Sequence, residues 1–224
     1  TLYLEIVDYP GEWLLDLPML AQDYLSWSRQ MTGLLQGQRA GWSAKWRQLC
    51  EGLDPLAPAD ENRLAAIADA WTAYLHQCKQ EGLHFIQPGR FVLPGDLAGA
   101  PALQFFPWPD VDGVGESTLA QADKHTNAGM LRERYHYYCE KVVKGFYKNH
   151  FLRFDRQIVL VDCLQPLNSG PQAFNDMRLA LTQLMQSFHY GQRTLFRRLF
   201  SPVIDKLLFA ATKADHVTVD QHAN

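Results

Sequence analysis

Two short acidic motifs in this sequence have residue types and spacing suited to phosphate and base chemistry. In the first motif, residues 7–11, Asp8 follows an apolar run and Gly11 comes three residues later. A carboxylate at Asp8 could hold Mg²⁺, directly or through water, because hard cations prefer oxygen ligands. Gly11 has no side chain, so its backbone N–H can approach a terminal phosphate. The first motif therefore predicts a metal and phosphate site.

The second motif, residues 212–215, reads Thr-Lys-Ala-Asp. The carboxylate of Asp215 can accept two hydrogen bonds from the N1–H and the exocyclic amine of guanine, and the aliphatic stem of Lys213 can cover the base. The hydroxyl of Thr212 can tie neighbouring loops together. Either motif alone is a common turn, but their order along the chain favours a nucleotide site.

Each motif follows a segment with the pattern of a strand. Apolar and polar residues alternate over residues 1–7, and residues 157–161 and 206–211 are nearly all apolar, as in buried strands. A long helix is predicted from Pro171, so the last two strands should be parallel and joined by a crossover. Ligands of open parallel sheets gather at the carboxyl ends of the strands, where both motifs should meet. The apolar stripe of that helix contains Phe174, Met177, Leu181, Leu184, Phe188 and Leu195.

The region between the first motif and residue 154 is predicted to be mainly helical. Apolar residues recur at helical spacing over three segments: 17–34, 64–78 and 131–146. The first helix should start at Asp16 and Pro18. The second should begin with Asp60 as its cap and end at Gly82. Residues 83–112 contain five prolines around short apolar runs, which indicates small strands or extended loop.

The composition excludes several classes of protein. The 224 residues contain 21 Lys and Arg against 24 Asp and Glu, so the net charge of −3 argues against a generic polyanion binder, and no DNA partner is expected. The four cysteines lie far apart without zinc spacing, which favours reduced thiols. No run approaches the roughly 18 apolar residues of a spanning helix and no leader pattern opens the chain, so a cytoplasmic location is expected.

Four runs carry a resemblance to a known family: residues 7–13, 103–107, 154–163 and 209–216. In these runs the sequence resembles the YcjX-like family of bacterial stress-associated GTP-binding proteins, within the GTPase branch of the phosphate-loop NTPases. The resemblance implies an α/β fold with a parallel sheet core and a large, mainly helical insertion. The core would comprise residues 1–12 and 155–224, and the insertion residues 13–154.

The resemblance also implies GTP binding and slow hydrolysis, with GTP or GDP and Mg²⁺ in the site. Asp8 would be the metal ligand, Gly11 would meet the γ-phosphate, and Thr212, Lys213 and Asp215 would form the guanine motif. Gly11 and Thr212 are far apart in the sequence, so losing the phosphate contact could reposition the whole helical insertion. The protein effector that such a change would address is unknown.

The sequence departs from the GTPase pattern in two places. No Gly-x-x-x-x-Gly-Lys-Ser/Thr phosphate loop occurs in the chain, and in family order this loop would lie upstream of Thr1. The chain is therefore interpreted as part of a longer protein. This part alone is expected to bind GTP weakly or not at all, because the phosphate loop supplies most contacts to the phosphates. Glu12 stands where Ras-like enzymes place a glutamine. A carboxylate there could orient the attacking water, yet it adds unfavourable charge beside a triphosphate unless a cation offsets it.

Other interpretations remain open. The protein could be a GTPase-like scaffold that no longer hydrolyses nucleotide and acts through its helical insertion, or an ATPase with relaxed base choice. Asp162 also ends a predicted strand and is interpreted as a structural aspartate near the site. The aromatic and basic residues of 131–156 could form a surface that binds a membrane or RNA. A helix that buries its aromatic side chains and exposes its charges is the favoured interpretation.

Overall fold

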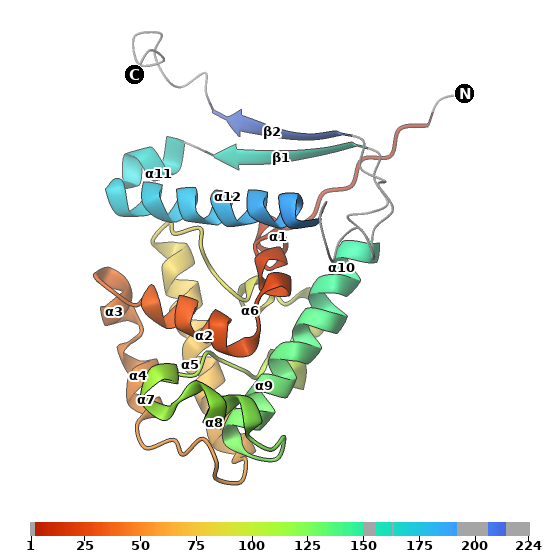
Figure 1. Ribbon diagram of the computed structural model, residues 1–224. Coiled ribbons are helices and arrows are strands. Elements are labelled where there is room, and N and C mark those ends of the chain that lie inside the picture. The colour runs from red at the N-terminus through yellow and green to blue at the C-terminus, as the bar shows by residue number, and fades with distance from the viewer. Residues whose placement is uncertain (1–2, 150–155, 163, 192–205, 214–224) are drawn as a thin grey trace.

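The computed structural model describes residues 3–149, 156–162, 164–191 and 206–213, and its architecture is mixed, mainly helical with a small parallel sheet (Figure 1). Two parts can be distinguished along the chain. The helical region, residues 11–149, forms most of the structure. In the described part of residues 156–213, the sheet layer has two strands and two helices, and its long helix lies between the strands and the helical region (Figure 1).

The helical region contains a few long helices and many short helical turns. Its first half comprises α1 (Gly11–Leu14), η1 (Leu17–Ala21), α2 (Tyr24–Gly33), α3 (Gln38–Trp42), α4 (Ala44–Cys50) and α5 (Glu61–Gln80). Its second half comprises α6 (Gly89–Val92), η2 (Gly95–Leu97), η3 (Pro101–Leu103), α7 (Val111–Val114), α8 (Glu116–Gln121), α9 (Asn127–Tyr137), the π-helical turn η4 (Tyr138–Val143) and α10 (Lys144–Asn149).

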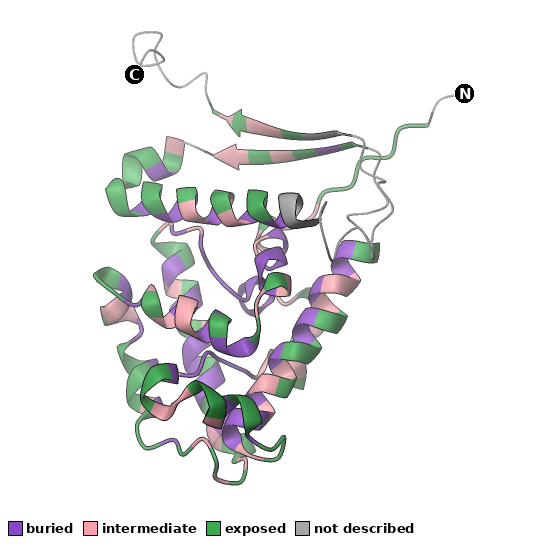
Figure 2. Cartoon of the chain, in the orientation of Figure 1, coloured by how far each residue is buried: buried purple, intermediate pink, exposed green. Residues whose placement is uncertain are grey.

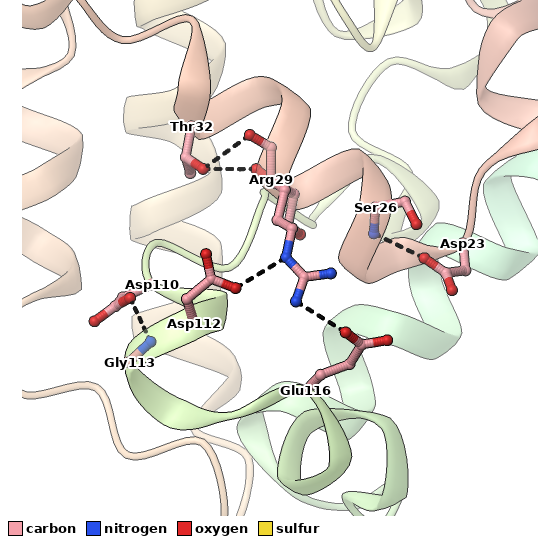
Figure 3. Close-up of polar contacts among 9 residues, drawn as sticks. Asp23, Ser26, Arg29, Thr32, Asp110, Asp112, Gly113 and Glu116 are labelled. Carbon is pink, nitrogen blue, oxygen red and sulfur yellow. Dashed lines mark hydrogen bonds and ion pairs between the residues drawn. The ribbon is translucent and has the colours of Figure 1, made fainter.

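Side-chain caps set where the longer helices begin. Asp60 accepts a hydrogen bond from the backbone N–H of Arg63 at 3.1 Å, which confirms the predicted start of α5. The single helix predicted from Asp16 is instead split into η1 and α2. Asp23, not Asp16, caps α2 by accepting from the N–H of Ser26 at 2.7 Å (Figure 3). Asp16 cannot serve as an exposed cap because its side chain is fully buried.

Buried positions are concentrated in the helical region, whereas the two strands are mostly intermediate or exposed (Figure 2). Aromatic side chains form much of this buried core. Its four largest buried side chains, Trp27, Trp46, Trp71 and Trp108, are each no more than 1% exposed. The rings of Trp46 and Trp71 lie 4.9 Å apart, a spacing at which aromatic pairs add stabilisation beyond their buried area. The predicted stripe of 131–146 belongs to this core, so its aromatics are mostly buried rather than presented to a membrane or RNA.

Residues 83–112 form no strand in this structure. The short turns α6, η2 and η3 replace the small strands that the sequence suggested, because prolines interrupt the run of donors that a strand ladder needs. The apolar runs are nevertheless part of the core, since Phe105 and Phe106 are both 0% exposed.

The predicted strand-helix-strand crossover is confirmed. Strands β1 (Arg156–Asp162) and β2 (Lys206–Thr212) pair in parallel, with Asp162 opposite Thr212 at the carboxyl ends. Helices α11 (Leu164–Ser169) and α12 (Pro171–Gly191) come between them in the chain. Of the predicted inner face of α12, Met177 and Leu184 are buried.

The buried face of α12 is rotated relative to the prediction. Phe174 is 38% exposed, whereas the small side chains of Ala173 and Ala180 are buried. Small residues let α12 approach its neighbours closely. A prediction based only on the spacing of large apolar residues does not detect such alanines. Of the other predicted positions, Leu195 and the side chain of Phe188 lie outside the described residues.

The two strands are buried on one face only. Ile158, Leu160 and Leu208 are 61%, 68% and 55% exposed, whereas Gln157 is 6% exposed and Val159 packs against the core. The expectation of buried strands therefore holds for one face only within the described residues, because no described layer covers the outer face.

The strand predicted over residues 1–7 is also not observed in its described part. Residues 3–10 form no strand, and Leu4 and Ile6 are 82% and 83% exposed. A strand needs a neighbour for its backbone N–H and C=O groups, and no described strand pairs with this segment. Among the described helices, none is long and apolar enough to cross a membrane.

Candidate functional site

A cavity of about 450 Å³ lies where the first motif meets the sheet layer. Gly11 and Glu12 line it on one side, and Asp162 and Gln165 line it at the carboxyl end of β1. Its remaining walls come from the end of α1 and Leu15, the end of α5, residues 82–86, the second half of β1 and the inner face of α12. The contributing residues are Leu14, Leu15, Lys79, Gly82, Leu83, His84, Ile86, Val159, Leu160, Val161, Met177, Ala180, Leu181 and Leu184. The end of the first motif and the end of β1 therefore share one cavity, which we call the site cavity.

Glu12 is fixed in this wall by its backbone and its side chain. Its Oε1 forms an ion pair with the Nζ of Lys79 at 2.7 Å. A Cβ atom placed on Gly89 would lie 2.1 Å from the carbonyl oxygen of Glu12, so only glycine permits α6 to pack this closely. Glu12 is thus held against α5 and α6.

The next side chain, Trp13, is held in the same way. Its Nε1 donates to the carbonyl oxygen of Leu93 at 3.0 Å, and the guanidinium of Arg90 lies 3.4 Å from the ring centroid. Such a cation–π contact attaches the segment after the first motif to the short turns of residues 89–97.

Asp16 forms a buried polar centre behind the first motif. Its Oδ1 accepts from the N–H of Gly89 at 2.7 Å, and its Oδ2 accepts from the hydroxyl of Tyr138, the first residue of η4, at 2.5 Å. Burial raises the pKa of the Asp16 carboxyl to about 7, although these hydrogen bonds act in the opposite direction. Through one side chain, the centre joins the start of η1 to α6 and to the π-helical turn.

The carboxyl ends of the two strands are joined by Asp162. Its Oδ1 accepts from the N–H groups of Leu164 and Gln165 at 3.1 and 3.2 Å, and its Oδ2 lies 2.5 Å from the Nζ of Lys213. The hydrogen bond from Lys213 lowers the pKa of Asp162 below its usual value. The expected place of Asp162 beside the site agrees with this geometry.

The described part of the second motif has an unusual backbone. Lys213 has a φ of +58°, a backbone conformation that residues other than glycine seldom adopt. Such conformations are found often at functional sites. The hydroxyl of Thr212 donates to the carbonyl oxygen of Val161 at 3.3 Å, so it ties β2 to β1. Asp215 lies outside the described residues, and its role remains a prediction.

Asp8 is exposed and does not line the site cavity. Within the described part of the chain its carboxylate forms no hydrogen bond and no ion pair, so both oxygens are available as ligands. This fits Mg²⁺, which is commonly bound by one or two carboxylates together with water and phosphate oxygens. The described residues contain no cluster of three or more His, Cys, Asp or Glu suited to a metal, so Asp8 alone would not form a complete site.

Two features of this site were not found from the sequence. Lys79 was not singled out, because its sequence position is far from Glu12 and a lysine at the end of a helix is commonly solvated. The second feature is the buried ion pair between Arg39 and Asp176 at 2.6 Å, in which Asp176 also accepts from the N–H groups of His84 and Phe85. This pair fixes α12, and with it one wall of the site cavity, to the helical region.

Comparisons with known proteins agree with the resemblance seen in the sequence. The family model of the YcjX-like family (DUF463) matches residues 1–224. The chain is 92% identical over 224 residues to the "Ras-like GTPase YcjX" of Escherichia coli (strain K12) and 49% identical over 226 residues to the protein of the same name from Shewanella oneidensis. These alignments cover 100% of this chain but 48% and 47% of those proteins, so the chain spans about half the length of the curated relatives it matches. Because the family model covers the whole chain, this chain belongs to the YcjX-like family.

Proposed function

We propose that this chain is part of a GTP-binding, GTP-hydrolysing regulatory protein with a phosphate-loop NTPase core. The observation that carries the proposal is the shared site cavity, in which the end of the first motif faces the carboxyl end of β1. The second motif begins beside that end, since Thr212 is paired with Asp162. The name Ras-like GTPase of the curated relatives supports the same activity. A role in stress rests on the family resemblance alone.

Selected residues of the two motifs would each have a separate role in binding the nucleotide. The oxygens of Asp8 would hold Mg²⁺, directly or through water, and the N–H of Gly11 would contact the γ-phosphate. The metal ion would neutralise the charge of the phosphates. At the other end of the nucleotide, Lys213 would pack on the base and Asp215 would select guanine through two hydrogen bonds.

The remaining contacts to the phosphates would come from a phosphate loop in the rest of the protein. Backbone N–H groups and a lysine of such a loop supply most of the charge neutralisation in this class of enzymes. We therefore expect the isolated segment of residues 1–224 to bind GTP weakly or not at all. A sub-micromolar dissociation constant of the segment would contradict this expectation.

The test is single-turnover GTP hydrolysis by the full-length protein and by its Asp8→Ala variant. We expect the variant to lose at least about tenfold in rate, because the metal loses its protein ligand, while Glu5→Ala, an exposed acidic residue of the same segment, keeps the rate of the parent protein. Nucleotide binding without hydrolysis by the parent would instead identify a scaffold that acts through the helical region.

Base selection needs a second measurement. We expect GDP to compete for the site far better than ADP, and Asp215→Asn to remove this preference, because an amide cannot accept both guanine hydrogen bonds. Equal competition by GDP and ADP in the parent protein would indicate an ATPase with relaxed base choice. An unchanged preference in the variant would show that another residue selects guanine.

A further inference from the structure

The ion pair between Lys79 and Glu12 gives the candidate site a cation that comes from the helical region. The two groups lie 2.7 Å apart at the wall of the site cavity, with side chains 40% and 23% exposed. Of the described residues that line this cavity, Lys79 alone carries an ammonium or guanidinium group. It is therefore the described group best placed to offset the charge of the Glu12 carboxylate.

Both partners are attached to rigid elements. Lys79 lies in the last turn of α5, which is anchored in the core by Trp71 and Tyr74, 1% and 3% exposed. The backbone of Glu12 is packed against Gly89 so closely that no side chain fits between them. The position of the carboxylate is thus determined by two packed helices rather than by a free loop.

This arrangement has little to do with folding stability. A partly exposed ion pair between a lysine and a glutamate contributes little, because the solvent screens it and the two side chains lose conformational freedom. The same pair matters far more for a carboxylate next to a triphosphate, where an uncompensated negative charge would repel the substrate.

We infer that Lys79 is a positioning residue for GTP hydrolysis, which holds the carboxylate of Glu12 oriented toward the attacking water and offsets its charge. This inference rests on the proposed function. During hydrolysis water forms a bond to the γ-phosphorus, the bond to the bridging oxygen breaks, and the water proton leaves with phosphate or solvent. Glu12 orders that water in the step, and Lys79 acts only through Glu12.

The experiment compares Lys79→Met, Lys79→Arg and Lys45→Met in the full-length protein. We expect Lys79→Met to lower kcat for GTP by roughly ten- to hundredfold with less than a twofold change in KM, since a small displacement of a catalytic group has effects of this size. Lys79→Arg should restore most of the rate because the charge remains. Lys45 is an exposed lysine of α4 away from the site cavity, and its variant should behave as the parent protein.

A double-mutant cycle with Glu12→Gln separates positioning from a general structural effect. We expect Lys79→Met to have almost no further effect on kcat once Glu12 is replaced, because the two residues act as a unit. Additive losses of kcat in the double variant, or an unchanged kcat of Lys79→Met, would overturn the inference about Lys79. The proposed function would still be supported in that case if the parent protein hydrolyses GTP. Absence of hydrolysis in the parent would instead contradict the proposed function. If Lys79→Met misfolds, as judged by its thermal unfolding, Lys79→Gln takes its place in the same cycle.

Discussion

The helical region and the sheet layer differ in how completely they are packed. The helical region encloses large aromatic side chains almost fully, with Trp27 and Tyr135 both 0% exposed. The sheet layer leaves Ile158, Leu160 and Leu208 more than half exposed on its outer face. Apolar patches of this kind mark surfaces that another layer covers. Within the described residues, the helical region therefore buries its own core, whereas one face of the sheet has no described layer over it.

Removing a core tryptophan should produce the largest effect. Trp71→Ala should lower the free energy of unfolding of this chain by about 3–5 kcal/mol, because it leaves a large cavity between Trp46 and Tyr74. The measurement is urea denaturation followed by circular dichroism. Leu208→Ala on the outer face of the sheet is the matched control, and an equal loss in both variants would contradict the contrast.

The buried carboxyl of Asp16 should make the stability of the helical region depend on pH. Its pKa is about 7 in the folded protein and about 3.8 when unfolded, so between these values the unfolded chain has already lost the proton that the folded chain retains. Stability should therefore fall as the pH rises from 4 to 7, by up to about 4 kcal/mol.

Asp16→Asn tests this dependence, because an amide does not titrate. Urea denaturation of the parent chain and the variant at pH 4.5, 6 and 7.5 should show that the variant gains stability relative to the parent as the pH rises. A constant difference between the two chains across this range would show that Asp16 does not titrate in the folded state.

The attachment of α12 to the helical region depends on a buried charge pair. Asp176→Asn should cost about 3 kcal/mol, because Arg39 then remains as a buried charge without its carboxylate. The exposed pair of Arg29 with Asp112 and Glu116 provides the control (Figure 3). Asp112→Asn should leave the midpoint of urea denaturation almost unchanged, and similar midpoint shifts for the two variants would refute the assignment.

A substitution on the outer face of the sheet should have the smallest effect on the stability of this chain. Leu160→Ser should change the stability of this chain by less than about 1 kcal/mol, because the side chain is 68% exposed. In the full-length protein the same substitution should cost about 1–3 kcal/mol if a further layer buries it. Hydrogen exchange of β1 in both chains is a second measurement, and equal protection would argue against a covering layer.

Local sequence patterns predicted the elements that depend on their own residues. The cap at Asp60 and the helical periodicity that follows it gave α5, and the apolar run before Asp162 gave β1. The crossover between the strands also followed from pattern, because a long helix between two short apolar segments favours parallel pairing. The predicted strand of residues 1–7 failed in its described part, since the alternation was present but a neighbouring strand was not.

The candidate site was only partly predictable for the same reason. The sequence singled out Asp8, Gly11 and Lys213 by motif, and it noted Asp162 at the end of a strand. It gave no sign of Lys79, because contact between distant side chains leaves no local pattern. The experiments above test the predicted roles of Asp8 and Asp215 in nucleotide binding, and the roles of Gly11, Thr212 and Lys213 stay predictions.

The sequence by itself determined the two motifs, the family, helix α5 and the strand–helix–strand order of the sheet layer, because these depend on residue types and on spacing along the chain. Only the tertiary structure decided that Lys79 meets Glu12, that Asp162 holds Lys213 and that Arg39 meets Asp176. The physical reason is that such contacts depend on how packed helices and strands bring distant residues together, and the shape of the core sets that arrangement.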